Sequence, residues 1–121
     1  MINDVSIGVD MEDVRRFERF KKRGSHRFLS RVFTKAELKY CFSQANSAER
    51  LAARYAAKEA AVKALGAFGL EKIEYKDIEI RKRKNGALSV VFHSSPYKKI
   101  NAMISISHSG DMAIGFCLLS I

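Results

Sequence analysis

Regular alternation of apolar with small or polar residues is found at the start of the chain and in its C-terminal part. A period of two is typical of half-buried strands. It predicts strands at residues 5–9, 77–81, 88–92, 101–107 and 112–119. Asn85-Gly86 and Gly110-Asp111 provide turns between the later strands, and both residues of the first pair tolerate the positive φ angles of a tight hairpin.

Helical patterns fill most of the region between these strands. A capping-box spacing at residues 34–37 predicts a helix that runs to about Phe42. A similar pattern at residues 46–49 opens the longest helix, which is expected to run to about Leu65 and to stop at Gly66.

The order of these elements indicates the fold class. A charged amphipathic stretch at residues 11–22 follows the first strand and is broken at Gly24-Ser25. Helices then precede an antiparallel sheet, which predicts an α+β fold with helices packed on that sheet. The 121 residues include no repeat or linker and only one proline, Pro96, so residues 1–121 are expected to form a single domain.

The charge of the chain bears on its partners. Lys and Arg number 22 against 13 Asp and Glu, a formal net charge of +9. Such a surface suits nucleic acid, a phosphate-rich ligand, an acidic protein or an anionic membrane, or simply serves solubility, and charge alone does not choose. No apolar run reaches the ~20 residues of a membrane span, and the N-terminus lacks a signal-peptide pattern. Because Cys41 and Cys117 have no metal-ligand spacing, a cytoplasmic protein with reduced cysteines is expected.

Two places on the first strand and the long helix carry candidate chemistry. Asp10 follows the first strand, where an Asp often caps a helix and where a rigid carboxylate also suits a hard cation. Glu59 and Lys63 lie one helical turn apart, either as an exposed ion pair or as a functional pair. Ala52 and Ala56 lie on the same side of the helix as Glu59 and Lys63. Their small side chains would let another element approach the helix backbone closely. The expected core positions of the helix are Leu51, Tyr55, Val62 and Leu65.

A third candidate lies at the end of the strand predicted at residues 101–107. If Ile104 and Ile106 face the core, His108 shares their side, and the serines at 105, 107 and 109 face the other way. An imidazole, hydroxyls and free backbone N–H groups beside a turn could hold a phosphate. The plain alternative is an edge strand with a surface histidine.

Three segments occur in a fixed order: Ile7-Gly-Val-Asp10, Arg54-Tyr-Ala-Ala-Lys-Glu59-Ala-Ala-Val-Lys63-Ala-Leu-Gly66 and Ile104-Ser-Ile-Ser-His108-Ser109. In this order they resemble the small, single-domain holo-acyl-carrier-protein synthases of the 4′-phosphopantetheinyl transferase family. Residues 27–38 are also similar to that family, and the likeness covers nearly the whole chain.

The resemblance implies a 4′-phosphopantetheinyl transferase-like fold and transfer of phosphopantetheine from coenzyme A to a serine of apo-acyl carrier protein, in fatty acid biosynthesis. It implies that Asp10 and Glu59 bind Mg²⁺ and that Lys63 meets the coenzyme A pyrophosphate. Phosphoryl transfer suits such a site, because it depends on positioning and charge neutralisation more than on covalent help. The general base stays open between a metal-bound water and Glu59.

The same resemblance implies further contacts to coenzyme A. Ser107 and His108 would lie near its 3′-phosphate, and Arg54 would also bind the coenzyme. The family is trimeric with sites between subunits, so Asp10 and Glu59 would come from one subunit and His108 from its neighbour.

The basic residues near the N-terminus would then meet an acidic carrier protein. They are Arg15, Arg16, Arg19, Lys22, Arg23 and Arg27. Reversing the charge at Arg16 and Arg23 is expected to raise KM for the carrier protein far more than KM for coenzyme A.

Two alternatives compete with this interpretation. The first is a basic α+β module that binds nucleic acid without catalysis, for which residues 81–84 supply charge. The chain has no recognisable nucleic-acid motif, however, and such a module leaves Asp10 and Glu59 unexplained. The second is a trimeric scaffold without activity, against which the intact Asp10, Glu59 and Lys63 argue.

Overall fold

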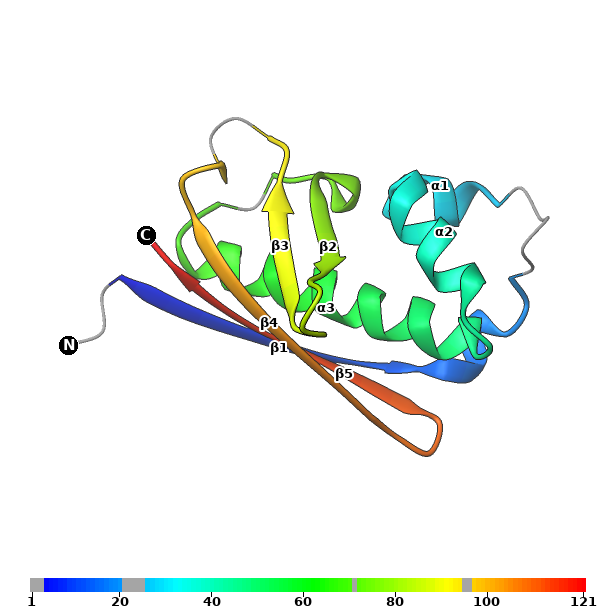
Figure 1. The fold of residues 1–121 in the computed structure, drawn as a ribbon. Helices are drawn as coiled ribbons and strands as arrows, with labels where there is room; N and C mark the ends of the chain where they lie inside the picture. Colours follow the sequence, from blue (N-terminus) through cyan, green and yellow to red (C-terminus); the bar gives the residue numbers. More distant parts are fainter. Residues whose placement is uncertain (1–3, 21–25, 71, 95–96) are drawn as a thin grey trace.

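The computed structural model describes residues 4–20, 26–70, 72–94 and 97–121, and it has the predicted α+β architecture (Figure 1). Its helical elements are the 3₁₀ turn η1 (Val14–Phe17), α1 (Arg27–Val32), α2 (Lys35–Ser43), α3 (Ser47–Ala67) and the 3₁₀ turn η2 (Tyr75–Asp77). Its strands are β1 (Val5–Asp13), β2 (Ile78–Lys82), β3 (Leu88–Phe92), β4 (Asn101–Ser109) and β5 (Met112–Ser120).

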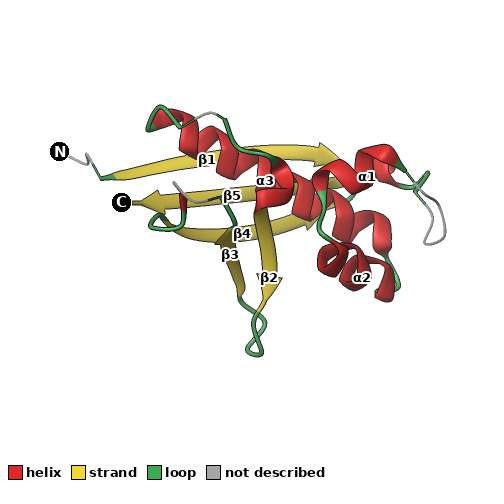
Figure 2. Ribbon diagram, turned by 90° about the horizontal axis from the view of Figure 1, so that it is seen from above, coloured by secondary structure: helices red, strands yellow, loops and turns green. Residues whose placement is uncertain are grey.

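The strands form two antiparallel sheets, a three-stranded sheet in the order β1-β5-β4 and the β2-β3 hairpin. Helix α3 lies over β1 and β5, and α1 and α2 pack beside its N-terminal half (Figure 2). Glycines in left-handed conformation form both predicted hairpin turns, Gly86 with φ 90° and Gly110 with φ 57°. Among the described residues, no helix is both long and apolar enough to cross a bilayer.

Helix α3 approaches the sheet unusually closely because small residues meet at the contact. A Cβ atom at Gly8 of β1 would collide with the carbonyl oxygen of Ala60, and one at Gly115 of β5 would collide with the backbone of Ala56. Ala56 therefore has the predicted role of admitting a neighbouring backbone, and Ala60, which was not predicted, does the same for Gly8. This contact fixes β1 against the second half of α3.

The first strand extends beyond its predicted end. β1 pairs with β5 residue by residue as far as Asp13 and Met112, so Asp10 lies within the strand. The expectation that the strand ends at Asp10 is therefore wrong, and so is the alternative role of Asp10 as a helix cap. Asp13 is the residue that caps η1, by accepting a hydrogen bond from the Arg15 backbone N–H. The predicted break at Gly24-Ser25, together with Lys22, Arg23 and Pro96, lies outside the described residues.

Local signals located the starts of α2 and α3 correctly. Thr34 and Glu37 form a complete capping box, and the Asn46 side chain accepts a hydrogen bond from the backbone N–H of Glu49. The end of α3 was predicted too early, because the helix continues through Gly66 to Ala67. Gly69, with φ 77°, is the glycine that adopts the left-handed conformation after the helix.

The two faces of the three-stranded sheet differ sharply. The inner face packs on α3, whereas the described helices leave the outer face uncovered (Figure 1). Val9 pairs there with Phe116, and Met11 with Ile114. Large apolar side chains on this face are between 37% and 65% exposed: Ile7, Val9, Met11, Met103, Ile114 and Phe116. We call these six residues the outer apolar face.

Candidate active site

Asp10 and Lys63 come together where β1 crosses α3. Even-numbered residues of β1 point toward the helix, which places the Asp10 carboxylate on the inner side of an edge strand. The Lys63 ammonium donates hydrogen bonds to Asp10 Oδ1 and to the Val9 carbonyl oxygen, each at 3.0 Å. Two of the three residues predicted to do the chemistry are therefore in direct contact.

The Asp10 carboxylate is only half satisfied. Its side chain is 16% exposed, and its Oδ2 atom is buried without a hydrogen-bond partner among the described residues. Leaving a buried charged acceptor unpaired is costly, so such an atom suits a cation or a donor brought by a ligand. Lys63, in contrast, is 54% exposed and can move from Asp10 toward a ligand.

Glu59, the third predicted residue, is half-buried, and its charge acts on two tyrosines. Burial raises the pKa of both Tyr55 and Tyr75, and the neighbouring Glu59 carboxylate raises each further. Asp10 also contributes electrostatically to the raised pKa of Tyr75, so Glu59 and Asp10 act on the same phenol. Tyr55 was predicted as a core residue and is half-buried, whereas no feature of the sequence indicated Tyr75.

Glu12 adds a further carboxylate beside Asp10. Burial and the neighbouring Asp10 side chain raise its pKa to about 7, the charge of Glu59 adds to this, and Arg16, whose guanidinium lies 2.7 Å from Glu12, opposes it. Glu12 lies on the same face of β1 as Asp10. It was missed because the strand was predicted to end at Asp10.

These acidic side chains fit a magnesium ion held together with a ligand. Within the described ranges, no three or more His, Cys, Asp or Glu side chains form a ready-made metal cage. Mg²⁺ commonly takes one or two carboxylates and completes its shell with phosphate oxygens and waters. The bare oxygen of Asp10, with the Glu59 carboxylate nearby, is a donor set of that kind.

Ser107 and His108 lie elsewhere in the same chain. They belong to β4, which β5 separates from β1, so they occupy the opposite edge strand from Asp10. The predicted alternation holds, since Ile106 packs on the core and Ser107 is exposed on the other face. The His108 imidazole lies 3.3 Å from Glu49, near the start of α3.

Arg54 lines a separate hollow of about 300 Å³ between α2, α3 and β2. Only 2% of Arg54 is exposed, and its guanidinium lies 4.3 Å from the centre of the Tyr40 ring. Its Nε atom is buried without a hydrogen-bond partner in the described part of the chain. Lys82 approaches the same ring at 5.7 Å, so two cations share one aromatic platform.

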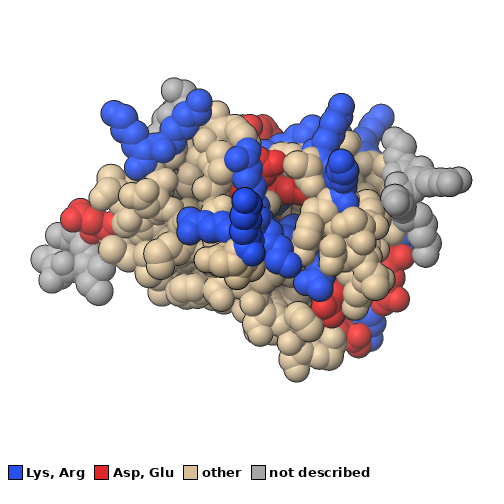
Figure 3. All heavy atoms as spheres, viewed as in Figure 1, with Lys and Arg blue, Asp and Glu red and all other residues tan. Residues whose placement is uncertain are grey.

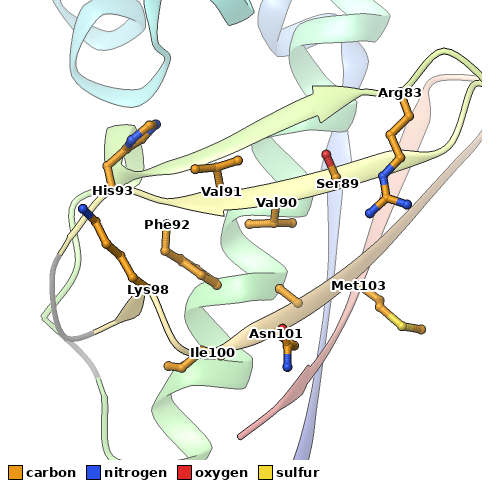
Figure 4. A pocket seen from close by; sticks show the side chains of 11 residues that line it. Arg83, Ser89, Val90, Val91, Phe92, His93, Lys98, Ile100, Asn101 and Met103 are labelled. Carbon is orange, nitrogen blue, oxygen red and sulfur yellow. The ribbon is translucent and has the colours of Figure 1, made fainter.

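A larger hollow of about 610 Å³ lies between β3 and β4 (Figure 4). Val90, Phe92 and Ile100 line its interior, while Arg83 and Lys98 stand at its two ends. None of the residues predicted to act on a substrate lines it. The larger hollow therefore does not coincide with Asp10, Glu59 and Lys63, which belong to β1 and α3.

Basic side chains spread over the face that carries β2, β3 and the short helices (Figure 3). Near η1 their partners differ: Arg15 pairs with Asp13, Arg16 pairs with Glu12, and Arg19 lies over the Phe20 ring. Arg27 is exposed at the start of α1. Arg16 is thus part of the acidic cluster, which makes it less suitable than Arg27 for testing a docking surface.

Comparison with known proteins supplies a family. The model of the 4′-phosphopantetheinyl transferase superfamily matches residues 6–117. The holo-[acyl-carrier-protein] synthase of Carboxydothermus hydrogenoformans is 39% identical over 120 residues, 94% of this chain and 96% of that protein. The enzyme of the same name from Moorella thermoacetica is 45% identical over 118 residues, 93% and 91% of the two chains.

Solved structures agree with this assignment. Helicobacter pylori holo-[acyl-carrier-protein] synthase in complex with coenzyme A superposes with a TM-score of 0.77 at 29% identity, covering 94% of this chain and 99% of that one. The ACPS–CoA complex of Chronobacterium ammoniagenes superposes with a TM-score of 0.78 at 26% identity, covering 96% of each chain.

Proposed function

The chain belongs to the 4′-phosphopantetheinyl transferase superfamily, and from this premise we propose that it is a holo-acyl-carrier-protein synthase. It transfers the 4′-phosphopantetheine group of coenzyme A to a serine of apo-acyl carrier protein and releases 3′,5′-ADP. The observation that carries the proposal is the half-satisfied Asp10 beside Lys63 and Glu59 at the contact of β1 with α3. The nucleic-acid-binding alternative is not supported.

In the proposed reaction the serine hydroxyl oxygen of the carrier protein forms a bond to the β-phosphorus of coenzyme A. The bond from that phosphorus to the bridging oxygen breaks, and the electron pair leaves with 3′,5′-ADP. The Lys63 ammonium is exposed, so it can move from Asp10 to the diphosphate of coenzyme A. There its positive charge offsets the negative charge that builds on the departing phosphate. Glu59 is a candidate acceptor for the serine proton, because it is half-buried and lies one helical turn from Lys63, which contacts Asp10.

Asp10 and Glu59 would hold Mg²⁺ at this site. When bound, the ion neutralises charge on the diphosphate and orients it for in-line displacement. The support from this chain is the buried Asp10 oxygen that lacks a partner.

Arg54, Ser107 and His108 would bind the nucleotide end of coenzyme A. Arg54 offers a buried cation with an unused Nε donor at the edge of a hollow. Ser107 and His108 lie on the strand opposite Asp10, so they would reach the same coenzyme A molecule from a neighbouring subunit.

A homotrimer with sites between subunits would also cover the outer apolar face. Exposed apolar patches of this kind commonly mark protein–protein interfaces. Sedimentation analysis should give three times the 13.7 kDa chain mass for the wild type, and Phe116→Glu should sediment as smaller species with a native circular dichroism spectrum. A wild-type monomer that transfers phosphopantetheine would refute this part of the proposal.

The partner would be a small acidic acyl carrier protein of fatty acid biosynthesis, which the basic side chains of η1 and α1 would attract. We also propose that the protein is located in the cytoplasm. The two buried, unpaired cysteines, Cys41 and Cys117, are in keeping with a reducing compartment.

The decisive experiment is mass spectrometry of an apo-acyl carrier protein incubated with coenzyme A, Mg²⁺ and this protein. One phosphopantetheine arm should appear on a single serine, and release of 3′,5′-ADP should match it mole for mole. Glu59→Gln should retain the fold and lose the transfer, whereas Glu74→Gln, an exposed acid outside the site, should behave as wild type. An unmodified carrier protein with the wild-type enzyme would refute the assignment.

A further inference from the structure

Lys58, next to Glu59 in sequence, points into the protein and is fully buried. Its ammonium lies 2.8 Å from Glu37 Oε1 and donates hydrogen bonds to the carbonyl oxygens of Tyr75 at 2.9 Å and Ile78 at 2.6 Å. All three donors of the ammonium are therefore used. A buried lysine is stable in its charged form only when it is paired and hydrogen-bonded in this way.

Glu37 is held just as completely. Only 2% of it is exposed, its Oε1 accepts the backbone N–H of Thr34, and its Oε2 accepts the backbone N–H of Ile80, each at 2.8 Å. The pair thus joins the start of α2, the first turn of η2 and strand β2 to the middle of α3. Lys58 and Glu59 are neighbours on one helix. The groups that Lys58 binds, which belong to Glu37, Tyr75 and Ile78, are therefore also held in position relative to Glu59.

The Tyr75 carbonyl oxygen that accepts from Lys58 belongs to a residue whose ring packs beside the turn of α3 that carries Glu59. Tyr75 begins η2, and its ring packs on Tyr55 with centroids 5.9 Å apart. Tyr55 lies one helical turn before Glu59 on α3, and burial and the neighbouring Glu59 carboxylate raise the pKa of Tyr75. Tyr55 packs in turn on Phe17 and Phe28. Tyr75 is therefore anchored at its backbone by Lys58 and along its ring by aromatic neighbours.

We propose that Lys58 is a positioning residue for the reactive site: paired with Glu37, it fixes the main chain of Tyr75 so that the Tyr75 phenol braces the Glu59 carboxylate. This inference rests on the proposed function for the role of Glu59. A carboxylate that must share a metal ion gains from a partner that limits its rotamers, and removing such partners typically costs 10–100-fold in metal affinity or activity.

A purely structural Lys58 would stabilise the fold without acting through Tyr75, and a double-mutant cycle separates the two cases. Tyr75→Phe removes only the phenol hydroxyl. Lys58→Met combined with Glu37→Gln removes both buried charges, so that neither is left unpaired, and combining this pair of changes with Tyr75→Phe completes the cycle. Tyr97→Phe is the matched control, since its hydroxyl donates to the Lys72 carbonyl oxygen at 3.2 Å, away from Glu59.

Two readouts are needed. Steady-state kinetics give kcat and KM for both substrates, and calorimetry with coenzyme A and Mg²⁺, without carrier protein, gives affinity in the absence of turnover. Tyr75→Phe should lower kcat about 10-fold and weaken coenzyme A binding, with KM for the carrier protein unchanged. The Lys58 and Glu37 changes should have a similar effect alone and add less than about 2-fold when Tyr75 is already Phe.

Multiplicative losses in the cycle would overturn the inference, and so would a Tyr75→Phe enzyme equal to wild type in both readouts. If the charge-free pair failed to fold, the Tyr75→Phe measurements would still decide the role of the phenol. Absence of transfer by the wild-type protein would refute the proposed function instead, and that outcome is separate from any result of the cycle.

Discussion

Two lysine–carboxylate pairs on α3 have nearly the same contact distance and opposite surroundings. Lys58 and Glu37 are 2.8 Å apart, both buried, and their polar atoms are satisfied by neighbouring backbone. Lys63 and Asp10 are 3.0 Å apart, but Lys63 is more than half exposed and Asp10 keeps one oxygen without a partner. The first pair is complete within the protein, whereas the second needs something from outside.

The position of each lysine on the helix explains the difference. Lys58 faces the side of α3 covered by α2, η2 and β2, where backbone groups surround it. Lys63 lies near the end of α3, over β1, which is an edge strand. The two lysines are five positions apart on one helix, so residue type alone does not distinguish an ion pair that is complete within the protein from one that is open to solvent.

The largest expected effect tests the closed pair through stability. Lys58→Met leaves the Glu37 charge buried and unpaired, so the free energy of unfolding should fall by about 3–5 kcal/mol. Urea denaturation at fixed protein concentration measures it, because an oligomer's stability depends on concentration. Lys63→Met should change the same quantity by less than about 1 kcal/mol, since the Lys63–Asp10 pair is largely solvated on the lysine side. If Lys58→Met and Lys63→Met lowered the free energy of unfolding equally, the two pairs would not differ in their contribution to stability.

The open pair should show the reverse behaviour in activity. Lys63→Met should lower kcat for phosphopantetheine transfer about 10²–10³-fold, because it removes a charge that offsets the developing negative charge on the departing phosphate. Lys63→Arg keeps the charge and should recover part of the loss. Product formation followed by mass spectrometry checks both variants. A Lys63→Met enzyme with wild-type kcat would remove Lys63 from the proposed mechanism.

Features set by local contacts could be predicted from the sequence, whereas features set by long-range contacts could not. The capping residues Thr34 and Asn46 act on backbone only three residues away, so the starts of α2 and α3 could be predicted from local pattern. The continuation of β1 through Asp10 depends on β5, about a hundred residues later, and no local signal reports that pairing. For the same reason Glu12 was not predicted as part of the site. In a strand that continues to Asp13, residues 10 and 12 lie on the same face, so Glu12 lies beside Asp10.

The surroundings of a charge were harder to predict than its presence. The resemblance to a known family predicts Asp10, Glu59 and Lys63 as site residues, and the contact between Asp10 and Lys63 is observed. The burial of Lys58 was not foreseen, because its partners come from residues 37, 75 and 78 and meet only in the folded chain. The contact of Tyr75 with Lys58 could not be predicted for the same reason.

The smallest expected effect concerns cations whose proposed partner is another protein. Arg27, exposed at the start of α1, should contribute to encounter with an acidic carrier protein, so Arg27→Glu should raise KM for the carrier about 2–5-fold and leave KM for coenzyme A unchanged. The increase in KM for the carrier protein should become smaller as salt is added. Salt screens exposed charges, and such charges at the edge of an interface act mainly on the association rate. Lys99→Glu makes the same change in net charge at an exposed site in the β3–β4 connection, at the other end of the molecule (Figure 1). If both variants raise KM for the carrier equally, the carrier protein responds to overall charge, and the surface formed by η1 and α1 is not its docking site.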